Sequence, residues 1–284
     1  RARNRDALAL AARELVRVLA QVVVAQPDLG QHLGGLLTLR CPAQHNSLSE
    51  TLKTELRRLL AELSHDRELG ALVITGEGRS FCSGGDLRHL KNAERSADFD
   101  RRRLYQLHDW VQPLMNLEMP VIAAVNGPAI GAGFGLALAA DFILCAPEAY
   151  FRASFSRVGL VPDTGLFFTL PRIVGLQSAK EITFTGRKVD AAEALALRIA
   201  LAVHAGERLM DEAMALARRL AQGPTAAIGA SKRILNQSFH LDARALVEME
   251  AAAQAIFFHS SFHQQAIDDF ASGTPFRYDW ERPH

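Results

Sequence analysis

The sequence predicts an α/β fold followed by a helical C-terminal region. Up to about residue 206, short apolar runs bounded by glycine or proline alternate with longer segments of helical spacing, in a strand, strand, helix rhythm. From residue 207 onward, the segments with an apolar stripe have helical spacing. We therefore divide the chain into an N-terminal helical extension (1–20), an α/β core (21–206) and a C-terminal helical region (207–284).

The composition supports a sizeable core and excludes several classes of partner. Of the 284 residues, 49% are hydrophobic, and the formal net charge of +1 gives no basis for binding nucleic acid. No apolar run approaches the ~18 residues of a membrane span. Three cysteines without CxxC spacing fit a reducing compartment, so we expect a cytoplasmic protein. The ten histidines include no HExxH pair, and we expect no metal site.

The first part of the chain contains a helix, two strands and a second helix. Residues 7–19 have helical spacing, whereas the apolar runs 21–26 and 36–39 read as a hairpin of two strands. Ser49 is a suitable N-cap for a helix over 52–63.

The middle of the chain carries three further strands. We expect them at 71–75, 120–125 and 141–145. A charged, weakly apolar segment over 88–102 predicts a mobile or partly helical flap, and a helix follows over 103–117.

The chain beyond residue 165 is largely helical, and its last four helices leave apolar faces without an obvious core of their own. They could cover the α/β core or pair with another subunit. The predicted ranges are 207–221, 225–239, 243–258 and 261–272.

Two glycine-rich turns follow buried strands. One is NGPAIGAGFG at 126–135, and the other is FCSGGDL at 81–87. The first opens a helix, whose N-terminal amides have no partner within the helix and attract negative charge. Two such turns, each offering a backbone N–H to one oxygen, would form an oxyanion hole. A dinucleotide site is disfavoured, because the spacing is GxGxG and five residues separate the strand from these glycines.

Taken together, FCSGGDL, PVIAAVNGPAIGAGFGLALAAD, the VGLVPDTG–LPRIVG segment and CPAQHNSLS resemble the enoyl-CoA hydratase/isomerase (crotonase) superfamily. The resemblance implies a spiral of repeated ββα units with a C-terminal helical trimerisation region, assembled as a homotrimer or a dimer of trimers. It implies an acyl-CoA substrate and no further cofactor. The oxyanion donors would be the amides of Gly85 and Ala132, each typically worth ~10²–10³ in rate.

The same resemblance implies which residues contact the substrate, and it shows that the glutamates that carry protons in family hydratases are absent at the corresponding positions. The two glutamates of family hydratases would fall at Gly135 and Phe155, so hydration by two glutamates is doubtful. Gln44 stands where the family often has Lys or Arg near the CoA phosphates. The CoA-binding and substrate-binding positions implied are Gln44, Ser47, Ser83, Gly84, Asp86, Leu87, Gly133 and Phe155.

Asp163, in GLVPDTG, is the remaining acid–base candidate. Ring-epoxide and enoyl-CoA isomerases resemble this sequence there, with an Asp as proton shuttle. Phenylalanines at 134, 155, 167 and 168 suggest an apolar setting, which would raise the pKa of the carboxyl group. The alternative is that Asp163 only caps a helix beginning near Thr164.

Two other functions stay open. The 4-chlorobenzoyl-CoA dehalogenases also resemble this segment, which implies a nucleophilic role for Asp163, in a dehalogenase or a thioester hydrolase, with His108 as base. The absence of both glutamates also fits a family member that binds acyl-CoA without turning it over.

Overall fold

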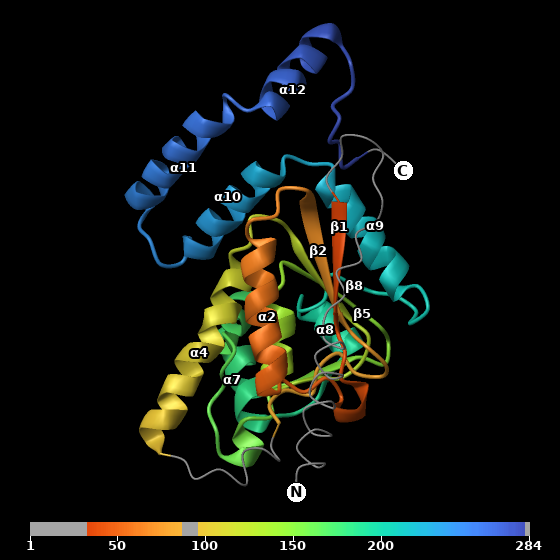
Figure 1. The fold of residues 1–284 in the computed structure, drawn as a ribbon, viewed down its shortest axis with the longest axis vertical. Coiled ribbons are helices and arrows are strands. Elements are labelled where there is room, and N and C mark those ends of the chain that lie inside the picture. The colour runs from red at the N-terminus through yellow and green to blue at the C-terminus, as the bar shows by residue number, and fades with distance from the viewer. Residues whose placement is uncertain (1–32, 87–95, 282–284) are drawn as a thin grey trace, which may run out of the picture.

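The computed structural model describes residues 33–86 and 96–281 (Figure 1). The helix expected over 7–19, the strand over 21–26 and hence the hairpin lie outside the described residues. The same holds for Leu87 and for most of the segment expected to form a flap.

A five-stranded parallel sheet forms the centre of the fold. Its strand order is β1-β2-β3-β5-β8, and every pair within it is parallel. β2 and β3 are buried along their whole length, as expected for a sheet covered on both faces. The strands are β1 (Leu33–Leu39), β2 (Leu69–Gly76), β3 (Val121–Val125), β5 (Phe142–Cys145) and β8 (Ala202–Val203).

A second, three-stranded sheet accompanies the first. It contains β4 (Ala129–Ile130), β6 (Tyr150–Arg152) and β7 (Val189–Asp190), with β4 parallel and β7 antiparallel to β6. These strands were not predicted from the sequence, because two or three residues are too few to show the alternation of apolar and polar side chains that marks a strand. A long strand is followed by a short one and then a helix in two places, over residues 121–138 and 142–174, which confirms the predicted ββα unit there.

Helices cover the two faces of the large sheet. On one face lie α2 (Glu50–Leu63) and α4 (Ala97–Met115), and on the other lies α9 (Leu209–Ala221) (Figure 1). Each face has its own cluster of buried apolar side chains. α9 packs against β1, β2 and β3, so the first helix beyond residue 206 completes the packing of the sheet.

α4 begins six residues earlier than expected, at Ala97 rather than at 103. The side chain of Ser96 accepts a hydrogen bond from the N–H of Phe99, and Asp98 and Asp100 place negative charge in the first turn. Both features stabilise a helix N-terminus. Residues 97–102 of the expected flap are thus helical, as the expectation of a partly helical segment allows, and only the predicted start of the helix at 103 is wrong. Ser49, by contrast, caps α2 as predicted, through the N–H of Leu52.

Short helices link the two sheets and lead into the C-terminal region. A helix follows Gly165, as predicted, although it begins at Leu166 and has Gly165 as its N-cap. These helices are α5 (Ala132–Leu138), α6 (Leu166–Val174), α7 (Leu176–Thr185) and α8 (Ala191–Ala196).

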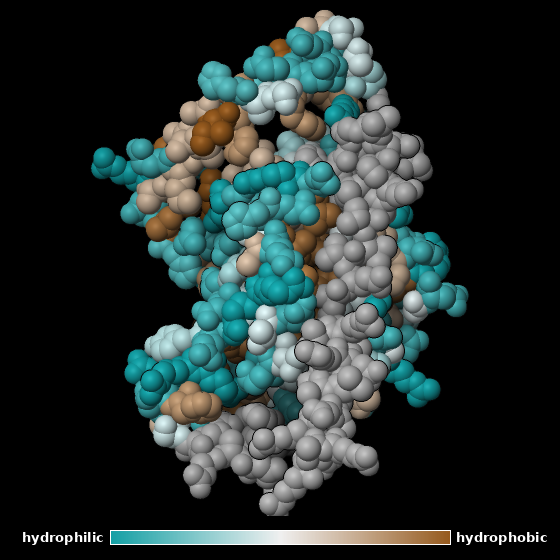
Figure 2. Space-filling model, viewed as in Figure 1, coloured by the Kyte–Doolittle hydropathy of each residue, from teal (hydrophilic) through white to brown (hydrophobic). Residues whose placement is uncertain are grey.

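The last three helices are α10 (Thr225–Gln237), α11 (Ala243–Phe257) and α12 (Ser261–Ser272). α11 and α12 contain no buried residue, and Figure 2 shows apolar surface on the lobe that contains α11. Val247, Ile256 and Phe270 are 55%, 68% and 72% exposed. Among the described residues, no helix is long and apolar enough to cross a membrane.

Candidate active site

The two glycine-rich turns lie against each other. The N–H of Ile130 donates to Cys82 O at 2.9 Å, and the N–H of Cys82 donates to Pro128 O at 3.1 Å. A Cβ on Gly133 would stand 2.1 Å from Cys82 O, and one on Gly84 would stand 2.5 Å from Ile130 O. Side chains cannot be accommodated at such distances. The glycines are therefore required because the two backbones approach so closely.

The two predicted oxyanion donors meet at this contact. Ala132 is the first residue of α5, and its N atom lies 3.2 Å from the position of a Cβ on Gly84. The N–H groups of Gly85 and Ala132 donate to no acceptor within residues 33–86 and 96–281. The space beside Gly85 is open, since a Cβ there would meet no described atom within 4 Å. The turns thus hold two backbone donors without acceptors among the described residues, and the space beside one of them, Gly85, is open.

The predicted CoA-binding residues gather on the loop before α2. Ser83 Oγ donates to Gln44 O at 3.3 Å, and Ser47 Oγ lies 3.5 Å from Gln44 Oε1. The buried side chain of Asn46 holds the loop in place, since its amide donates to the carbonyls of Glu77 and Ser80. Gln44, Ser47, Ser83 and Gly84 are therefore brought together, whereas Leu87 lies outside the described residues.

Asp163 lies half-buried just before α6. Burial raises the pKa of its carboxyl group, and a hydrogen bond from Thr164 Oγ1 at 2.8 Å opposes that rise, as do the charges of Arg103, Lys53 and His108. The prediction of a raised pKa is confirmed. Among the described residues, Thr164 is the only donor to this carboxylate, and no backbone N–H of α6 donates to it. The carboxylate therefore does not cap α6, which was the alternative role.

Gly135 positions the Asp163 turn against the oxyanion helix. A Cβ at Gly135 would stand 2.7 Å from both Cβ and O of Thr164. The position where hydratases carry a glutamate is thus filled by the backbone of the neighbouring turn. At the second glutamate position, Phe155 is 7% exposed, and its ring comes within 3.8 Å of a Cβ built on Gly131. The structure places an apolar ring at one position and no space at the other.

The phenylalanines that the sequence suggested as an apolar setting are divided. Phe134 and Phe155 are buried and Phe168 packs against the core, but Phe167 is 61% exposed. The desolvation of Asp163 therefore does not depend on Phe167.

Two cations that the sequence analysis missed lie beside the oxyanion turn. A cavity of about 250 Å³ is lined by Gly85 and Asp86, by the start of α2 including Glu50 and Lys53, and by Arg103 of α4. Lys53 Nζ donates to Glu50 Oε1 at 2.8 Å. The signal was present in the sequence, because Lys53 interrupts the apolar face that α2 presents to the core.

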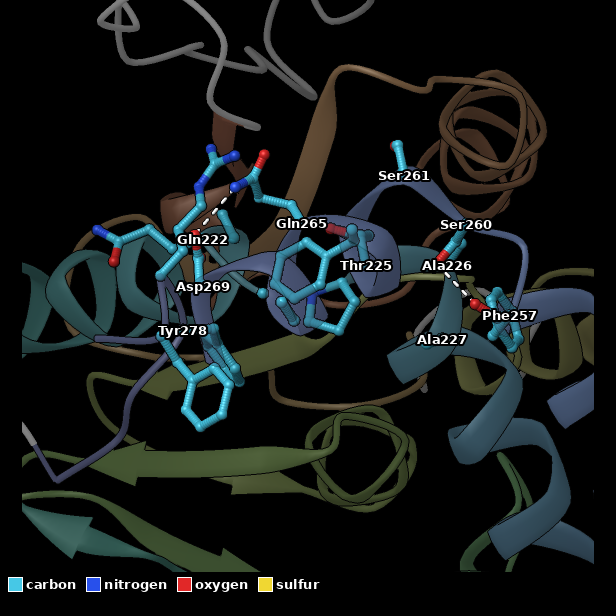
Figure 3. A pocket seen from close by; sticks show the side chains of 17 residues that line it. Gln222, Thr225, Ala226, Ala227, Phe257, Ser260, Ser261, Gln265, Asp269 and Tyr278 are labelled. Carbon is cyan, nitrogen blue, oxygen red and sulfur yellow. Dashed lines mark hydrogen bonds between the residues drawn. The ribbon is translucent and has the colours of Figure 1, made fainter. Parts of the chain in front are cut away.

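Two larger cavities lie elsewhere. One of about 680 Å³ lies between the start of α10 and the α11–α12 region, and Figure 3 shows it lined by Phe257, Gln265 and Tyr278 among others. Another of about 660 Å³ lies between α10, α6 and the start of β5. None of the predicted site residues lines either cavity. In the part of the chain that the structure describes, no group of three His, Cys, Asp or Glu residues is placed to hold a metal ion.

The spiral of ββα units and the paired glycine turns define a crotonase-type protein. The chain belongs to the enoyl-CoA hydratase/isomerase family, since residues 35–281 match the model of that family. It is therefore an enzyme of the crotonase superfamily.

Relatives named for different activities resemble the chain to a similar degree. The probable enoyl-CoA hydratase EchA12 of Mycobacterium tuberculosis is 38% identical over 217 residues, 74% of each chain. The 1,2-epoxyphenylacetyl-CoA isomerase of Escherichia coli is 32% identical over 82% of this chain and 90% of its own. The 4-chlorobenzoyl coenzyme A dehalogenase-2 of an Arthrobacter species is 35% identical over 69% and 72%.

A solved structure supports the fold over nearly the whole chain. The enoyl-CoA hydratase/isomerase of Cupriavidus metallidurans superposes with a TM-score of 0.83 and 34% identity, covering 92% of this chain and 97% of that one.

Proposed function

We propose that the enzyme isomerises an enoyl-CoA or a ring-type CoA ester through an enolate, with Asp163 as the acid–base group. One observation carries this proposal. The half-buried Asp163 carboxylate accepts a single hydrogen bond from described residues, and its turn packs directly on the helix that begins with Ala132. A carboxylate in that state retains lone pairs for a substrate proton.

The reaction begins with proton transfer to Asp163. The C–H electron pair moves toward the thioester carbonyl, and the negative charge on its oxygen is stabilised by the N–H groups of Gly85 and Ala132. Protonated Asp163 then returns the proton to a different carbon, so the double bond shifts and no atom is gained or lost. Burial supports this exchange because it raises the pKa of the Asp163 carboxyl group toward the operating pH.

Hydration requires groups that this site does not contain at the family positions. Neither Gly135 nor Phe155 can activate water, and the Thr164 backbone leaves no space for a longer side chain at 135. Isomerisation needs one group that takes and returns a proton, which Asp163 supplies.

The test compares wild type with Asp163→Asn. The amide retains the size of the side chain and cannot act as a base. We expect isomerisation of 3-enoyl-CoA or of a ring-epoxide CoA, measured by chromatography, to fall about 10²–10⁴-fold in kcat. Hydration of 2-enoyl-CoA at equal rates in both proteins would contradict the proposal. Binding of acyl-CoA without any turnover would instead favour the non-catalytic alternative.

A second candidate uses Asp163 as a nucleophile on an aryl-CoA or thioester. The similarity to a 4-chlorobenzoyl coenzyme A dehalogenase favours it, as does the charge of His108 acting on Asp163. On a halogenated aryl-CoA this route forms an aryl ester of Asp163 with loss of halide. On a thioester it forms a mixed anhydride of Asp163 with loss of the CoA thiolate. Water then hydrolyses the ester or the anhydride and restores the carboxylate. Mass spectrometry of the acid-quenched enzyme separates the two candidates, because only the nucleophilic route adds substrate mass to Asp163.

We also propose a trimer or a pair of trimers, held by the C-terminal helices. The exposed apolar side chains of α11 and α12 support this assembly. Light scattering after size-exclusion chromatography measures the mass directly, and a monomer at micromolar concentration would contradict it.

A further inference from the structure

The cavity beside Gly85 is lined by two cations from different helices and by the carboxylates of Glu50 and Asp86. Lys53 belongs to the first half of α2, and Arg103 to the first half of α4. The same two charges act on Asp163 across the site. The cavity therefore adjoins the predicted oxyanion donor Gly85, and its two cations act on the predicted acid–base group.

The donors of these cations are largely unused within the described residues. Lys53 is 8% exposed, and its ammonium has Glu50 as its only acceptor there, which leaves two N–H bonds. The Arg103 guanidinium donates no hydrogen bond to any described residue, although its Nε forms an ion pair with Asp100 Oδ1 at 3.6 Å. That Nε is buried without a hydrogen-bond partner among the described residues. A buried donor without an acceptor costs free energy, so a ligand that supplies acceptor oxygens would bind favourably here.

The size and the walls of the cavity restrict the ligand. At about 250 Å³ it is smaller than the ~300–1,000 Å³ of a typical ligand pocket. Leu48 is its only apolar side chain of appreciable size among the described lining residues. A long hydrocarbon chain would therefore meet charged groups, whereas a compact polar group would be matched by them.

We propose that Arg103 and Lys53 bind a carboxylate carried by the acyl group, so that the substrate class is the CoA thioester of a short dicarboxylic acid. This inference deepens the proposed function and rests on the same site. A carboxylate matches the planar fork of the guanidinium, which can donate two parallel hydrogen bonds to it. Lys53 supplies a second charge with its remaining N–H groups.

The test measures binding of glutaryl-CoA and pentanoyl-CoA by calorimetry, because these thioesters have the same carbon count and differ in the terminal carboxylate. We expect wild type to bind glutaryl-CoA roughly ten- to a hundredfold more tightly, in line with hydrogen bonds to charged groups. Arg103→Met removes the fork while retaining length, and should abolish most of this preference. Arg101→Met, two residues earlier on the same helix and directed to Tyr105, is the matched control and should retain it.

Equal affinity of wild type for the two thioesters would overturn the inference. So would an Arg103→Met variant that weakens both ligands equally, since that would mean a role in the general shape or charge of the site. Asp163→Asn separates this result from the proposed function, because binding does not require turnover. Carboxylate preference in a protein whose isomerisation survives Asp163→Asn would leave the inference standing and remove only the proposed mechanism.

Discussion

Two partly buried clusters in the described part of the chain combine acidic and basic side chains, and they differ in how completely their hydrogen bonds are satisfied. In the first, Lys232 of α10 donates to Asp141 Oδ2 at 2.7 Å and to Met119 O at 3.2 Å. The same carboxylate oxygen accepts from the N–H of Val121 at 2.7 Å. In the second, Lys53 and Arg103 line a cavity beside Gly85, and their charges act on Asp163 without a direct ion pair to it.

The difference separates a structural cluster from a functional one. Burial raises the pKa of Asp141 and lowers that of Lys232, while the attraction within the pair opposes both shifts. Each charge of that pair is compensated by its partner and by backbone groups, so little capacity remains for a ligand. Around Asp163, Lys53 pairs with Glu50 and Arg103 with Asp100, and neither cation donates a hydrogen bond to Asp163. Both cations keep N–H groups without an acceptor among the described residues, and both line the cavity. An incompletely satisfied cluster beside an open space is a site where substrate completes the bonding.

The largest expected effect on stability comes from breaking the first cluster. Lys232→Met leaves the Asp141 carboxylate, whose side chain is 25% exposed, without its counter-charge. We expect a loss of roughly 1.5–3 kcal/mol in the free energy of unfolding, as for a hydrogen bond between charged groups. Chemical denaturation, or thermal denaturation if unfolding is reversible, measures this loss. The double variant Asp141→Asn/Lys232→Met should recover most of the stability, because the amide still accepts from Val121 and no charge remains. A single variant within about 0.5 kcal/mol of wild type would show that the pair is not coupled in this way.

The next effect concerns the contact that holds the Asp163 turn on α5. Gly135→Ala places a Cβ 2.7 Å from Thr164, so the turn must move. Overpacking of this kind costs roughly 1–3 kcal/mol, against a helix-propensity gain of up to about 1 kcal/mol for replacing glycine by alanine. We expect a net loss of stability together with a fall in kcat, because the carboxylate moves relative to the oxyanion donors.

Gly206→Ala serves as the matched control for that change. A Cβ there would meet Glu148 Oε2 at 3.7 Å, an ordinary contact, so both stability and kcat should stay close to wild type. A Gly135→Ala enzyme with unchanged kcat would show that the position of the Asp163 turn does not govern the reaction. For the same reason, Gly135→Glu should fail to create a hydratase.

The strands could be predicted from the sequence only where the apolar run was long enough to recognise. The strands over Ala71–Thr75 and Val121–Val125 are apolar and flanked by breakers, and both form as expected within β2 and β3. The strands β4 and β7 span two residues each, and pairing rather than periodicity defines them.

The candidate site was predicted only where the motif is local. The glycine turns and Asp163 are recognisable because each motif is continuous in the chain. Lys53 and Arg103 are 50 residues apart in sequence and share the cavity only because α2 packs against α4. Likewise, the absence of space at Gly135 depends on Thr164, which folding brings against it.

The smallest expected effect again concerns Asp163, through the pH dependence of stability. Burial raises its pKa in the folded protein above the ordinary value of an aspartate, so the folded state holds the proton more tightly than the unfolded state. The contribution of this group to stability therefore falls as the pH rises from the pKa of the unfolded state through that of the folded state, and the cost is fully present above that window.

Asp163→Asn carries no charge and avoids this cost. If thermal unfolding is reversible, we expect its Tm to exceed that of wild type by a few degrees at pH 8, with the difference shrinking toward pH 4. Asp66→Asn, an exposed position, is a control for the general effect of removing one negative charge. A Tm difference for Asp163→Asn that is independent of pH, or that grows toward acid pH, would mean that the carboxylate is stabilised by its surroundings, as in the Lys232 cluster, and is not held in the costly state that catalysis requires.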